Sequence, residues 1–215
     1  MILDSLRITE VFYSLQGESN TVGLPTVFIR LTGCPLRCVY CDTAYAFTGG
    51  KKRSISNLLD EVKQYACRYV TVTGGEPLAQ PGCLDLMCQL LDQGYFVSLE
   101  TSGALDVAAV DPRVVKVMDF KTPSSGELDK NRYDNISHLN PKDQIKFVIA
   151  DDEDYAWSKT LLSQYHLPSV CEILFSPVMG KQNPTELAEK ILQDQLPVRF
   201  QIQLHKLLWH DAQGK

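Results

Sequence analysis

Residues 26–41 read TVFIRLTGCPLRCVYC, an apolar β-branched run followed by three closely spaced cysteines. The run TVFIRL (26–31) is typical of a parallel strand, because both faces of such a strand are buried. Cys34, Cys38 and Cys41 follow it directly in the spacing C-x3-C-x2-C. A 4Fe–4S cluster is normally held by four thiolates. Three thiolates with no fourth cysteine nearby therefore predict a cluster with one iron open to an external ligand, and hence an enzyme.

Structural zinc is the main alternative for the cysteine triplet. Such sites are almost always closed by four protein ligands, commonly in paired short spacings, and no second pair accompanies these cysteines. The four histidines are all distant from them in sequence: His138, His166, His205 and His210. A fold could still bring one histidine to the cysteines, so the spacing favours a cluster without excluding zinc.

Outside this segment, apolar runs alternate with segments of helical periodicity. Further strands are expected at 69–73, 96–100, 114–120, 144–149, 172–176 and 199–204. Helices are expected at 56–66, 83–93, 152–165 and 184–195. This alternation predicts an α/β protein with a parallel sheet, either open or closed into a barrel. With 215 residues and neither a repeat nor a linker, the chain is predicted to form one domain, residues 1–215.

Two helix ends carry sequence signals of their own. Asn183, Pro184 and Glu186 occupy the N-cap, first and third positions of the last expected helix, which is the pattern of a capping box. Gly94 follows the second expected helix, where a left-handed C-cap glycine belongs.

The composition narrows the class of protein. A net charge of −5 offers no broad basic face for nucleic acid. The only basic run, KKR at 51–53, is expected to be a solvated loop tip, with a docking patch for an acidic electron donor as the alternative. No apolar stretch reaches the roughly 20 residues that span a bilayer, and no signal-peptide pattern begins the chain. These features predict a reduced, cytoplasmic protein without nucleic-acid or membrane partners.

The other four cysteines are scattered through the chain. An odd total of seven in a chain of this length argues against a disulfide framework. The scattered residues are expected to pack as small buried hydrophobes, as free cysteine commonly does: Cys67, Cys83, Cys88 and Cys171.

Polar and glycine-rich motifs follow several of the expected strands. GGEP (74–77), TSG (101–103) and KTPSSGE (121–127) each stand directly after a strand. In parallel α/β folds, ligands bind at the carboxyl ends of strands, so these motifs are expected to meet the cysteines at one rim. Glycines let backbone approach a ligand closely, and Glu76 could receive an ammonium group. Taken alone, GGEP could equally be a tight turn.

At this point the chain resembles the radical S-adenosylmethionine (SAM) superfamily, whose cluster motif is C-x3-C-x-aromatic-C. Tyr40 fills the aromatic position, and GGE stands on the next expected strand of the parallel sheet. More finely, the chain resembles the 7-carboxy-7-deazaguanine synthase family of the deazapurine (queuosine precursor) pathway. The motifs that carry this resemblance span the chain in order: FYSLQGES (12–19), FIRLTGCPLRCVYCDT (28–43), TVTGGEPL (71–78), LETSG (99–103), MDFKTPSSGE (118–127) and QIQLHKLLW (201–209).

The resemblance implies a fold and a reaction. The fold is an incomplete (β/α)6-type partial barrel with fewer helices than the full barrel, and the protein is a homodimer. SAM binds the open iron, and one electron, from a donor such as flavodoxin or ferredoxin, releases a 5′-deoxyadenosyl radical. The reaction converts 6-carboxy-5,6,7,8-tetrahydropterin to 7-carboxy-7-deazaguanine with loss of ammonia, which makes the enzyme a carbon–nitrogen lyase.

The resemblance also implies roles for individual residues on the cofactor side. Cys34, Cys38 and Cys41 ligate the cluster. The residues expected to contact SAM are Tyr40, Gly75, Glu76, Ser102, Asp119, Lys121, Phe175, Ser176, Pro177 and Val178. Two alternatives stay open: Asp119 and Lys121 could form a structural ion pair, and FSPV (175–178) could be an ordinary strand end.

On the substrate side, Arg30 is expected to hold the substrate carboxylate, since a guanidinium can form a two-toothed bond to it. Thr43 corresponds to the family's Mg²⁺ position, and Mg²⁺ takes oxygen ligands while keeping several waters. The remaining expected contacts are Leu15, Gln16, Gly17, Glu18, Thr73 and His205. By itself LQGES (15–19) would be a polar turn, and a lone histidine at 205 could equally be a core residue.

Two competing functions remain at this stage. A glycyl-radical-enzyme activating enzyme would share the cluster and the GGE motif but act on a partner protein, and the LQGE loop and Arg30 speak against it. A non-catalytic iron–sulfur or zinc protein, such as a redox sensor, would leave the polar strand ends without a purpose.

Overall fold

A computed structural model describes residues 5–210 and 212–215, and across these residues nine strands form one sheet in the order β3-β1-β2-β4-β5-β6-β7-β8-β9. The strands are β1 Ser5–Leu15, β2 Pro25–Leu31, β3 Lys51–Ser54, β4 Tyr69–Gly74, β5 Phe96–Thr101, β6 Val115–Phe120, β7 Gln144–Ile149, β8 Glu172–Pro177 and β9 Arg199–Phe200. From β2 to β9 every neighbouring pair is parallel, whereas β1 is antiparallel to both β2 and β3.

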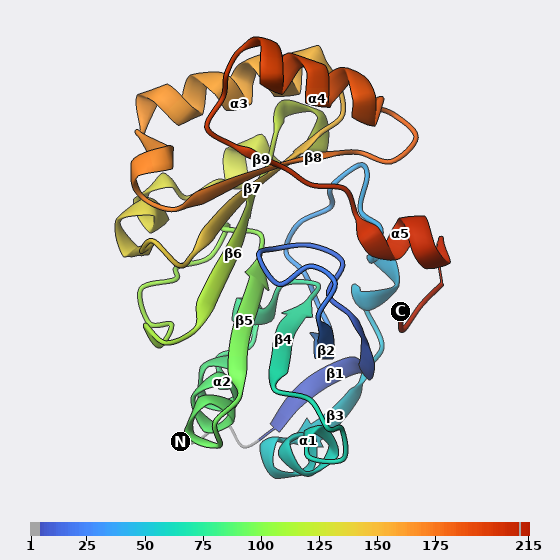
Figure 1. Ribbon diagram of the computed structural model, residues 1–215. Coiled ribbons are helices and arrows are strands. Elements are labelled where there is room, and N and C mark those ends of the chain that lie inside the picture. Colours follow the sequence, from blue (N-terminus) through green and yellow to red (C-terminus); the bar gives the residue numbers. More distant parts are fainter. Residues whose placement is uncertain (1–4, 211) are drawn as a thin grey trace.

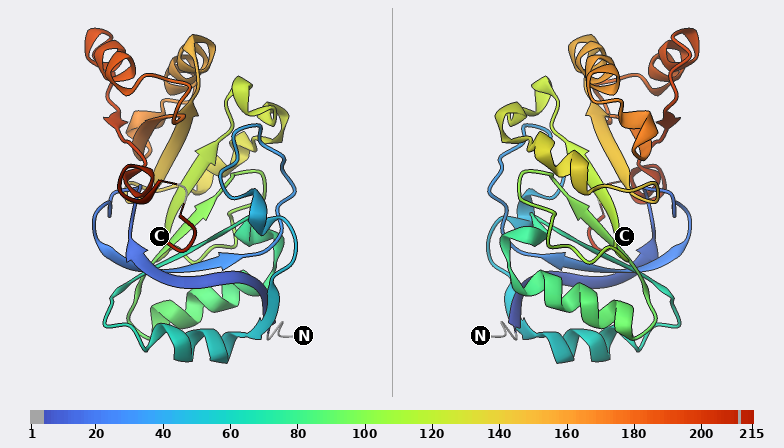
Figure 2. Two further views of the ribbon diagram at one scale, coloured as in Figure 1. Left: turned by 90° about the vertical axis from the view of Figure 1, so that its right-hand side faces the viewer. Right: turned by 90° about the vertical axis from the view of Figure 1, so that its left-hand side faces the viewer.

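Helices cover the outer side of the curved sheet in two groups, and the last helix, α5, lies apart from both beside the N-terminal loop (Figures 1 and 2). They are α1 Ile55–Val62, α2 Gly82–Asp92, α3 Asp152–Gln164, α4 Pro184–Gln193 and α5 Leu204–Trp209. The β5–β6 connection, which is described throughout, contains no helix, and the β6–β7 connection contains only short 3-10 turns. The architecture is therefore the expected α/β partial barrel, with fewer helices than a full one.

Two apolar cores hold the helices to the sheet. The first joins α1 and α2 to strands β1, β2, β4 and β5 through residues such as Leu58, Leu86 and Val72. The second joins α3 and α4 to β6, β7 and β8, with Phe147 and Phe175 at its centre. Both cores use alternate residues of the strands, because successive side chains point to opposite faces.

The inner face of the sheet is polar instead. Thr71 donates to or accepts from Ser98 at 2.8 Å, and Gln16 Nε2 donates to Thr71 at 3.0 Å. The strands were expected to be buried on both faces, but several positions of the inner face are only partly buried, among them Arg30, Glu100 and Lys146. On the inner face, the buried groups are hydrogen-bonded side chains, which is how buried polar groups avoid a desolvation cost.

Six of the seven expected strands are confirmed, and the expected strand 199–204 is largely wrong. Only Arg199–Phe200 pair with β8. At Gln201 the chain leaves the sheet, since its side chain bonds the backbone of Ser19, and Leu204 N donates to Gly17 O as α5 begins. Tertiary bonds to the N-terminal loop thus replace the ladder that a strand would have continued.

Two strands were not expected. β1 takes up residues 5–15, which include the start of the FYSLQGES motif (12–19), and KKR (51–53) lies in β3 instead of a loop tip. β3 pairs with β1 at the sheet edge, where charged side chains discourage further pairing.

Both helix ends lie where their sequence signals predicted them, although within the described residues no hydrogen bond from Asn183 N to the Glu186 side chain completes a capping box. Asn183 Oδ1 accepts from Thr185 N at 2.9 Å and caps α4, with Pro184 as its first residue. Gly94 has a φ of +87°, as a C-cap glycine requires. Of the scattered cysteines, Cys83 and Cys171 are buried as expected, while Cys67 and Cys88 are only partly buried. Across the described residues, no helix has the length and apolar character to traverse a bilayer.

Candidate active site

Two adjoining cavities open at the carboxyl ends of the strands. The cysteine cavity, of about 160 Å³, is lined by Cys34, Cys38 and Cys41. The arginine cavity, of about 200 Å³, is lined by Arg30 and by residues of the 15–18 loop. Six residues line both cavities: Asp42, Thr43, Thr73, Gly74, Glu100 and Lys146. The shared wall means that molecules held in the two cavities would lie side by side.

The cysteine loop is fixed by backbone contacts at its start. Gly33, with a φ of +98°, donates its N–H to Ala46 O at 2.8 Å and accepts from Glu76 N at 2.7 Å. A Cβ on Gly75 would lie 2.0 Å from Gly33 O, so only glycine permits this approach. The cysteine loop and the GGE segment are thus built against one another.

Burial keeps the three thiols protonated at neutral pH. It raises the pKa of Cys38 to about 11, and it raises the pKa of Cys34 and of Cys41 as well. Lys121 opposes this effect at all three sulfurs. Ligation of iron needs thiolates, so cluster assembly must displace these protons. Within the described residues, no three histidine, cysteine or acidic side chains gather closely enough to hold a single ion.

The Glu76 carboxylate does not line either cavity. It is fully buried, and its oxygens accept from Leu78 N, Thr101 Oγ1, Ser102 N and Ser102 Oγ. These four donors occupy the hydrogen-bonding capacity of a carboxylate. Its side chain is thus engaged by donors of the chain itself, and a contact between this carboxylate and an ammonium group stays a prediction. The GGE segment instead presents Gly74 and Gly75 to the cysteine cavity.

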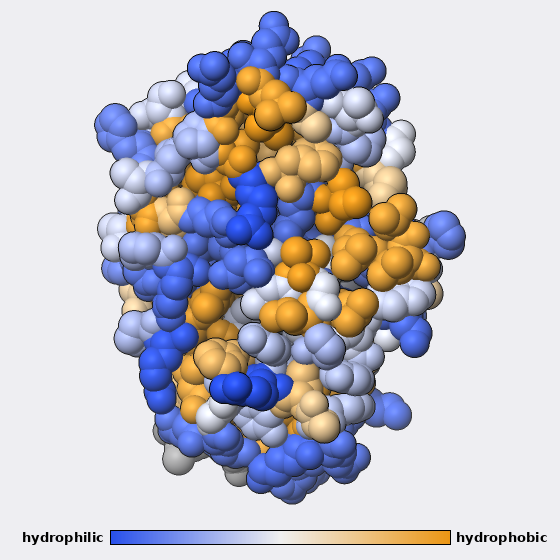
Figure 3. All heavy atoms as spheres, viewed as in Figure 1, coloured by the Kyte–Doolittle hydropathy of each residue, from blue (hydrophilic) through white to orange (hydrophobic). Residues whose placement is uncertain are grey.

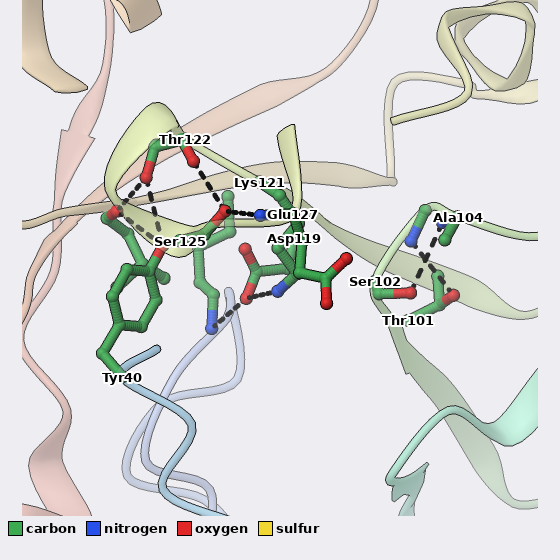
Figure 4. Close-up of polar contacts among 12 residues, drawn as sticks. Tyr40, Thr101, Ser102, Ala104, Asp119, Lys121, Thr122, Ser125 and Glu127 are labelled. Atoms are coloured by element: carbon green, nitrogen blue, oxygen red, sulfur yellow. Dashed lines mark hydrogen bonds and ion pairs between the residues drawn. The ribbon is translucent and has the colours of Figure 1, made fainter. Parts of the chain in front are cut away.

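Ser102, Asp119 and Lys121 do line the cysteine cavity. Lys121 Nζ lies 3.1 Å from Asp119 Oδ2, the contact drawn in Figure 4. The ion pair that was left open as an alternative therefore exists, and it stands in the cavity wall. Asp119 Oδ1 is buried without a hydrogen-bond partner among the described residues. An unsatisfied carboxylate oxygen beside a cavity is suited to a polar ligand.

Tyr40 lies between Cys38 and Cys41 in the chain but does not itself line either cavity. Its hydroxyl is 3.1 Å from Thr122 Oγ1, as Figure 4 shows, and its ring packs against Val148, Ala150 and Val178. Burial raises the pKa of Tyr40 far above its usual value, so the phenol stays neutral. Tyr40 and Val178 are thus brought together.

The other residues of the FSPV segment (175–178) lie in different surroundings. Phe175 packs against Phe147 and Tyr155 in the second core, so its expected contact with a cofactor is wrong for the side chain. Ser176 Oγ is buried without a partner within the described chain. Pro177 closes β8, so the strand-end alternative holds for it.

Arg30 lines the arginine cavity, and neighbouring side chains hold its guanidinium in place. Its Nε donates to Glu10 Oε1 at 2.7 Å, and the Tyr45 hydroxyl donates to the same oxygen at 2.7 Å. Phe12 and Phe28 stack at 4.8 Å beside it and line the cavity. A cation and aromatic faces therefore meet in one pocket.

The loop of residues 15–18 is buried, which rules out a merely solvated polar turn. Gln16 is 2% exposed and Glu18 is 8% exposed. Burial alone would raise the pKa of Glu18, but Lys146 Nζ at 2.5 Å lowers it below its usual value. Leu15, Gln16, Gly17 and Glu18 all line the arginine cavity, as does Thr73.

A C-terminal strap, residues 201–206, covers this loop. Gln203 Nε2 donates to Glu18 Oε1 at 2.7 Å, and Lys206 Nζ lies 3.0 Å from Asp42 Oδ2. His205 lines the arginine cavity, so it is not a core residue, and a Cβ on Gly17 would lie 2.3 Å from its Nδ1. The strap therefore ties the 15–18 loop to the segment that follows the cysteines.

Thr43 stands where the two cavities meet. Its hydroxyl donates to Asp42 Oδ1 at 2.8 Å. Burial would raise the pKa of Asp42, but Lys206 and the Thr43 hydroxyl hold it well below its usual range, so the carboxylate stays ionised. The shared wall thus carries the oxygen donors that a hard cation prefers.

Several cavity residues were not expected from the sequence. Lys146 lines both cavities and contacts Glu18 and Asp119. A charge inside the apolar run QIKFVI was the available signal for it, as it was for Arg30 in TVFIRL. Glu100 stands one residue before the TSG motif, where a strand-end acid could have been noticed. Glu10, Tyr45 and Gln203 carried no comparable signal, because their roles depend on which strands pair.

Comparison with known proteins points to one family. The sequence profile of the Radical SAM superfamily matches residues 28–119. The chain is 44% identical to a protein named 7-carboxy-7-deazaguanine synthase from Chlorobaculum tepidum, over 97% of each chain. It is 42% identical to the protein of that name from Koribacter versatilis, over 95% of this chain and 97% of the other.

Solved structures give the same relationship. The crystal structure of QueE from Escherichia coli superposes with a TM-score of 0.78 at 25% identity, covering 94% of this chain and 95% of the other. Streptococcus suis SuiB bound to its precursor peptide SuiA superposes with a TM-score of 0.59 at 13% identity. That match covers 80% of this chain and 46% of SuiB, which shows a shared fold alone.

Proposed function

The chain belongs to the 7-carboxy-7-deazaguanine synthase family, and from this we propose that it converts 6-carboxy-5,6,7,8-tetrahydropterin to 7-carboxy-7-deazaguanine with loss of ammonia. It does so as a radical SAM carbon–nitrogen lyase of queuosine and other 7-deazapurine biosynthesis. The observation that carries the proposal is the shared wall of the two cavities. It places three cysteines beside a pocket that holds an arginine and a buried polar loop.

On the cofactor side, the donor set fits a 4Fe–4S cluster with SAM on its open iron. Three thiols line one cavity, and Asp119 Oδ1 lies there without a partner in the described chain. When bound, the reduced cluster and SAM supply a 5′-deoxyadenosyl radical. The chain's own part is orientation. Cys34, Cys38 and Cys41 hold the cluster, and Lys121 with Asp119 offers paired charges to the polar end of SAM.

Other residues shape the rest of the cofactor pocket. Gly74 and Gly75 bring backbone close to the methionine part, while the Glu76 carboxylate fixes Ser102 through its backbone N–H and its hydroxyl. Tyr40 and Val178 provide an apolar shelf beside Ser176, suited to an adenine ring. Phe175 contributes to this pocket only by anchoring its strand in the core.

On the substrate side, the arginine cavity has groups suited to bind both ends of the pterin. Arg30 holds the carboxylate, and Phe12 and Phe28 offer aromatic faces to the ring. Gln16, Glu18 and the backbone of Leu15 and Gly17 supply donors and acceptors for the pterin edge. Thr73 and His205 complete the wall. Because the C-terminal strap covers this loop, it also limits the access of water, which protects radical chemistry.

Magnesium would bind at Thr43. The hydroxyl supplies one oxygen ligand and is oriented by its bond to Asp42, so substrate oxygens and water would complete the shell. The position between the two cavities suits an ion that bridges substrate and protein.

The remaining features of the proposal concern the whole protein. It acts as one domain over residues 1–215, in the cytoplasm, with reduced flavodoxin or ferredoxin as electron donor. It works as a homodimer. In support of a partner surface, Leu207 and Leu208 of α5 are 58% and 47% exposed, and apolar side chains gather where α5 lies (Figure 3).

The test is turnover by anaerobically reconstituted, reduced protein with SAM and 6-carboxytetrahydropterin. The proposal predicts 7-carboxy-7-deazaguanine. A glycyl-radical activating enzyme would give 5′-deoxyadenosine without that product, and a redox sensor would give neither. Cys38→Ala should abolish both the brown absorbance and turnover. The control is Cys88→Ala. Cys88 is a partly buried cysteine on α2 that does not line the cavity, so this variant should retain both the brown absorbance and turnover.

A further inference from the structure

A bulge in β1 decides which side chains reach the arginine cavity. β1 pairs with β2 antiparallel, and the register shifts between Ile8 and Glu10. Before the shift, Leu6 and Ile8 are buried in the first core. With a regular period of two, Glu10 would follow Ile8 into that core. After the shift it is Val11 that packs there, and Glu10 lies opposite Arg30 instead. Bulges commonly re-aim side chains beside active sites.

The re-aimed carboxylate accepts hydrogen bonds from two side chains. Glu10 Oε1 accepts from Arg30 Nε at 2.7 Å and from the Tyr45 hydroxyl at 2.7 Å. The guanidinium also lies 5.7 Å from the ring centroid of Phe12 and 5.9 Å from that of Tyr45, within range of a cation–π interaction. Both charged side chains are largely buried, at 15% and 20% exposure. The guanidinium is therefore held by a hydrogen bond at its Nε edge and by contacts with the faces of two aromatic rings.

We propose that Glu10, with Tyr45, is the positioning residue that orients Arg30 for the substrate carboxylate. The bond to Glu10 uses Nε and leaves the two terminal amino groups, for which the described chain supplies no hydrogen-bond acceptor. Those two groups are then available for a two-toothed bond to a ligand in the cavity that Arg30 lines. This inference rests on the proposed function, because it assumes a substrate with a carboxylate at that place.

The pair is poorly explained as a device that joins the strands. β1 and β2 already pair continuously from Glu10 to Leu15 against Arg30 to Pro25. An ion pair adds little to such a contact, whereas a carboxylate that fixes one edge of a guanidinium determines where its other edge points. Selection between a pterin with a carboxylate and one without it would therefore depend on Glu10 as well as on Arg30.

The experiment compares Glu10→Gln with a matched control, Glu61→Gln. Glu61 on α1 also pairs with an arginine, Arg53, at 2.5 Å and has similar exposure, but lies outside both cavities. In reconstituted enzyme, Glu10→Gln should raise KM for 6-carboxytetrahydropterin by about tenfold and leave kcat within about twofold. Glu61→Gln should leave both unchanged. Tyr45→Phe, which removes one donor to Oε1 and keeps the ring, should raise KM by a smaller factor.

A second readout separates orientation from general damage. Tetrahydropterin without the carboxylate should inhibit wild type and Glu10→Gln with equal inhibition constants. In an Arg30→Gln background, Glu10→Gln should not weaken substrate binding further. An unchanged KM in active Glu10→Gln enzyme, or equal weakening for the carboxylate-free compound, would overturn the role of Glu10. Absence of product from wild type would instead overturn the proposed function, and the inference with it.

Discussion

Gly75 is one of the positions where a single atom decides the geometry of the site. Any Cβ there would lie 2.0 Å from Gly33 O and 3.1 Å from Cys34 Cβ. The neighbour at 2.0 Å is backbone, which cannot move aside as a flexible side chain can. The GGE glycines were expected to admit a ligand closely. In the structure, Gly75 also admits the cysteine loop.

Gly75→Ala should therefore displace the cysteine loop and lower iron and sulfide content after reconstitution. Relief of such a clash costs about 1–3 kcal/mol. Gly94→Ala is the matched control, since its φ of +87° strains the backbone while a Cβ there meets nothing within 4 Å. Both variants should lose thermal stability, but only Gly75→Ala should lose cluster. Full cluster content in Gly75→Ala would show that the contact is not needed for assembly.

The carboxyl group of Glu100 makes the free energy of unfolding depend on pH. Burial raises its pKa, and the nearby charge of Glu18 raises it further. An acid whose pKa is raised on folding favours the native state while it is protonated. That contribution is complete below the unfolded pKa, near 4.3, and is lost as pH rises through the folded pKa. Above the unfolded pKa, Glu100 is therefore less favourable to the native state than a neutral side chain in its place.

Glu100→Gln should then raise the thermal midpoint at pH 7 but not at pH 4. Each 1 kcal/mol gained corresponds to about 2–4 °C in a protein of this size. Calorimetry at both pH values measures the difference. An equal shift at pH 4 and pH 7 would show that the carboxylate is not strained in the folded protein.

At the scale of residues, the sequence was enough to bring several predicted side chains to one cavity. The cysteine spacing and the strand-end positions of Ser102, Asp119 and Lys121 need only the order of the chain, and all reach the cysteine cavity. Glu76 and Phe175 could not be placed, since the direction of a side chain depends on neighbours distant in sequence.

At the scale of elements, the C-terminal strap is the least local part of the fold. Gln201 bonds both backbone groups of Ser19 at 2.8 Å across 182 positions. Ser19 has a φ of +67°, an uncommon conformation for a residue with a side chain. The apolar alternation of residues 199–204 indicated a strand, and nothing in that pattern could reveal that a loop near the N-terminus would compete for the backbone.

Gln201→Ala should release the 16–19 loop. Two buried backbone groups lose their partners, at a cost of about 1–3 kcal/mol, and KM for the pterin should rise. Amide exchange at Ser19 should also become faster. Gln193→Ala, an exposed glutamine at the end of α4, serves as the control and should change none of these quantities. Unchanged exchange at Ser19 in Gln201→Ala would mean that the strap does not hold the loop.

At the scale of the whole molecule, one sheet joins two separate apolar cores. The cores meet along the β5–β6 pair, where no helix crosses in the described connection. The alternation of strands and helices was enough to predict the α/β class and the rim where the motifs meet. Tertiary packing determines which connections lack an α-helix and why β1 and β3 pair antiparallel. These features were therefore not predictable from the local sequence pattern.

The proposed single domain requires that the two cores unfold together. Leu86→Ala, in the first core, should cost about 2–5 kcal/mol. Trp157 packs against the second core, so its fluorescence, in a Trp209→Phe background, reports the far half of the molecule. The fluorescence midpoint should fall as far as the midpoint from circular dichroism. A fall in circular dichroism alone would indicate two independently folding halves.

The central claim is that three cysteines hold a cluster whose remaining iron is open to SAM. The most direct measurement is the electron paramagnetic resonance spectrum of the anaerobically reconstituted, reduced protein with and without SAM. The account predicts a 4Fe–4S signal that shifts on addition of SAM and is absent in Cys38→Ala. A signal that ignores SAM, from a metal centre ligated entirely by protein, would contradict it.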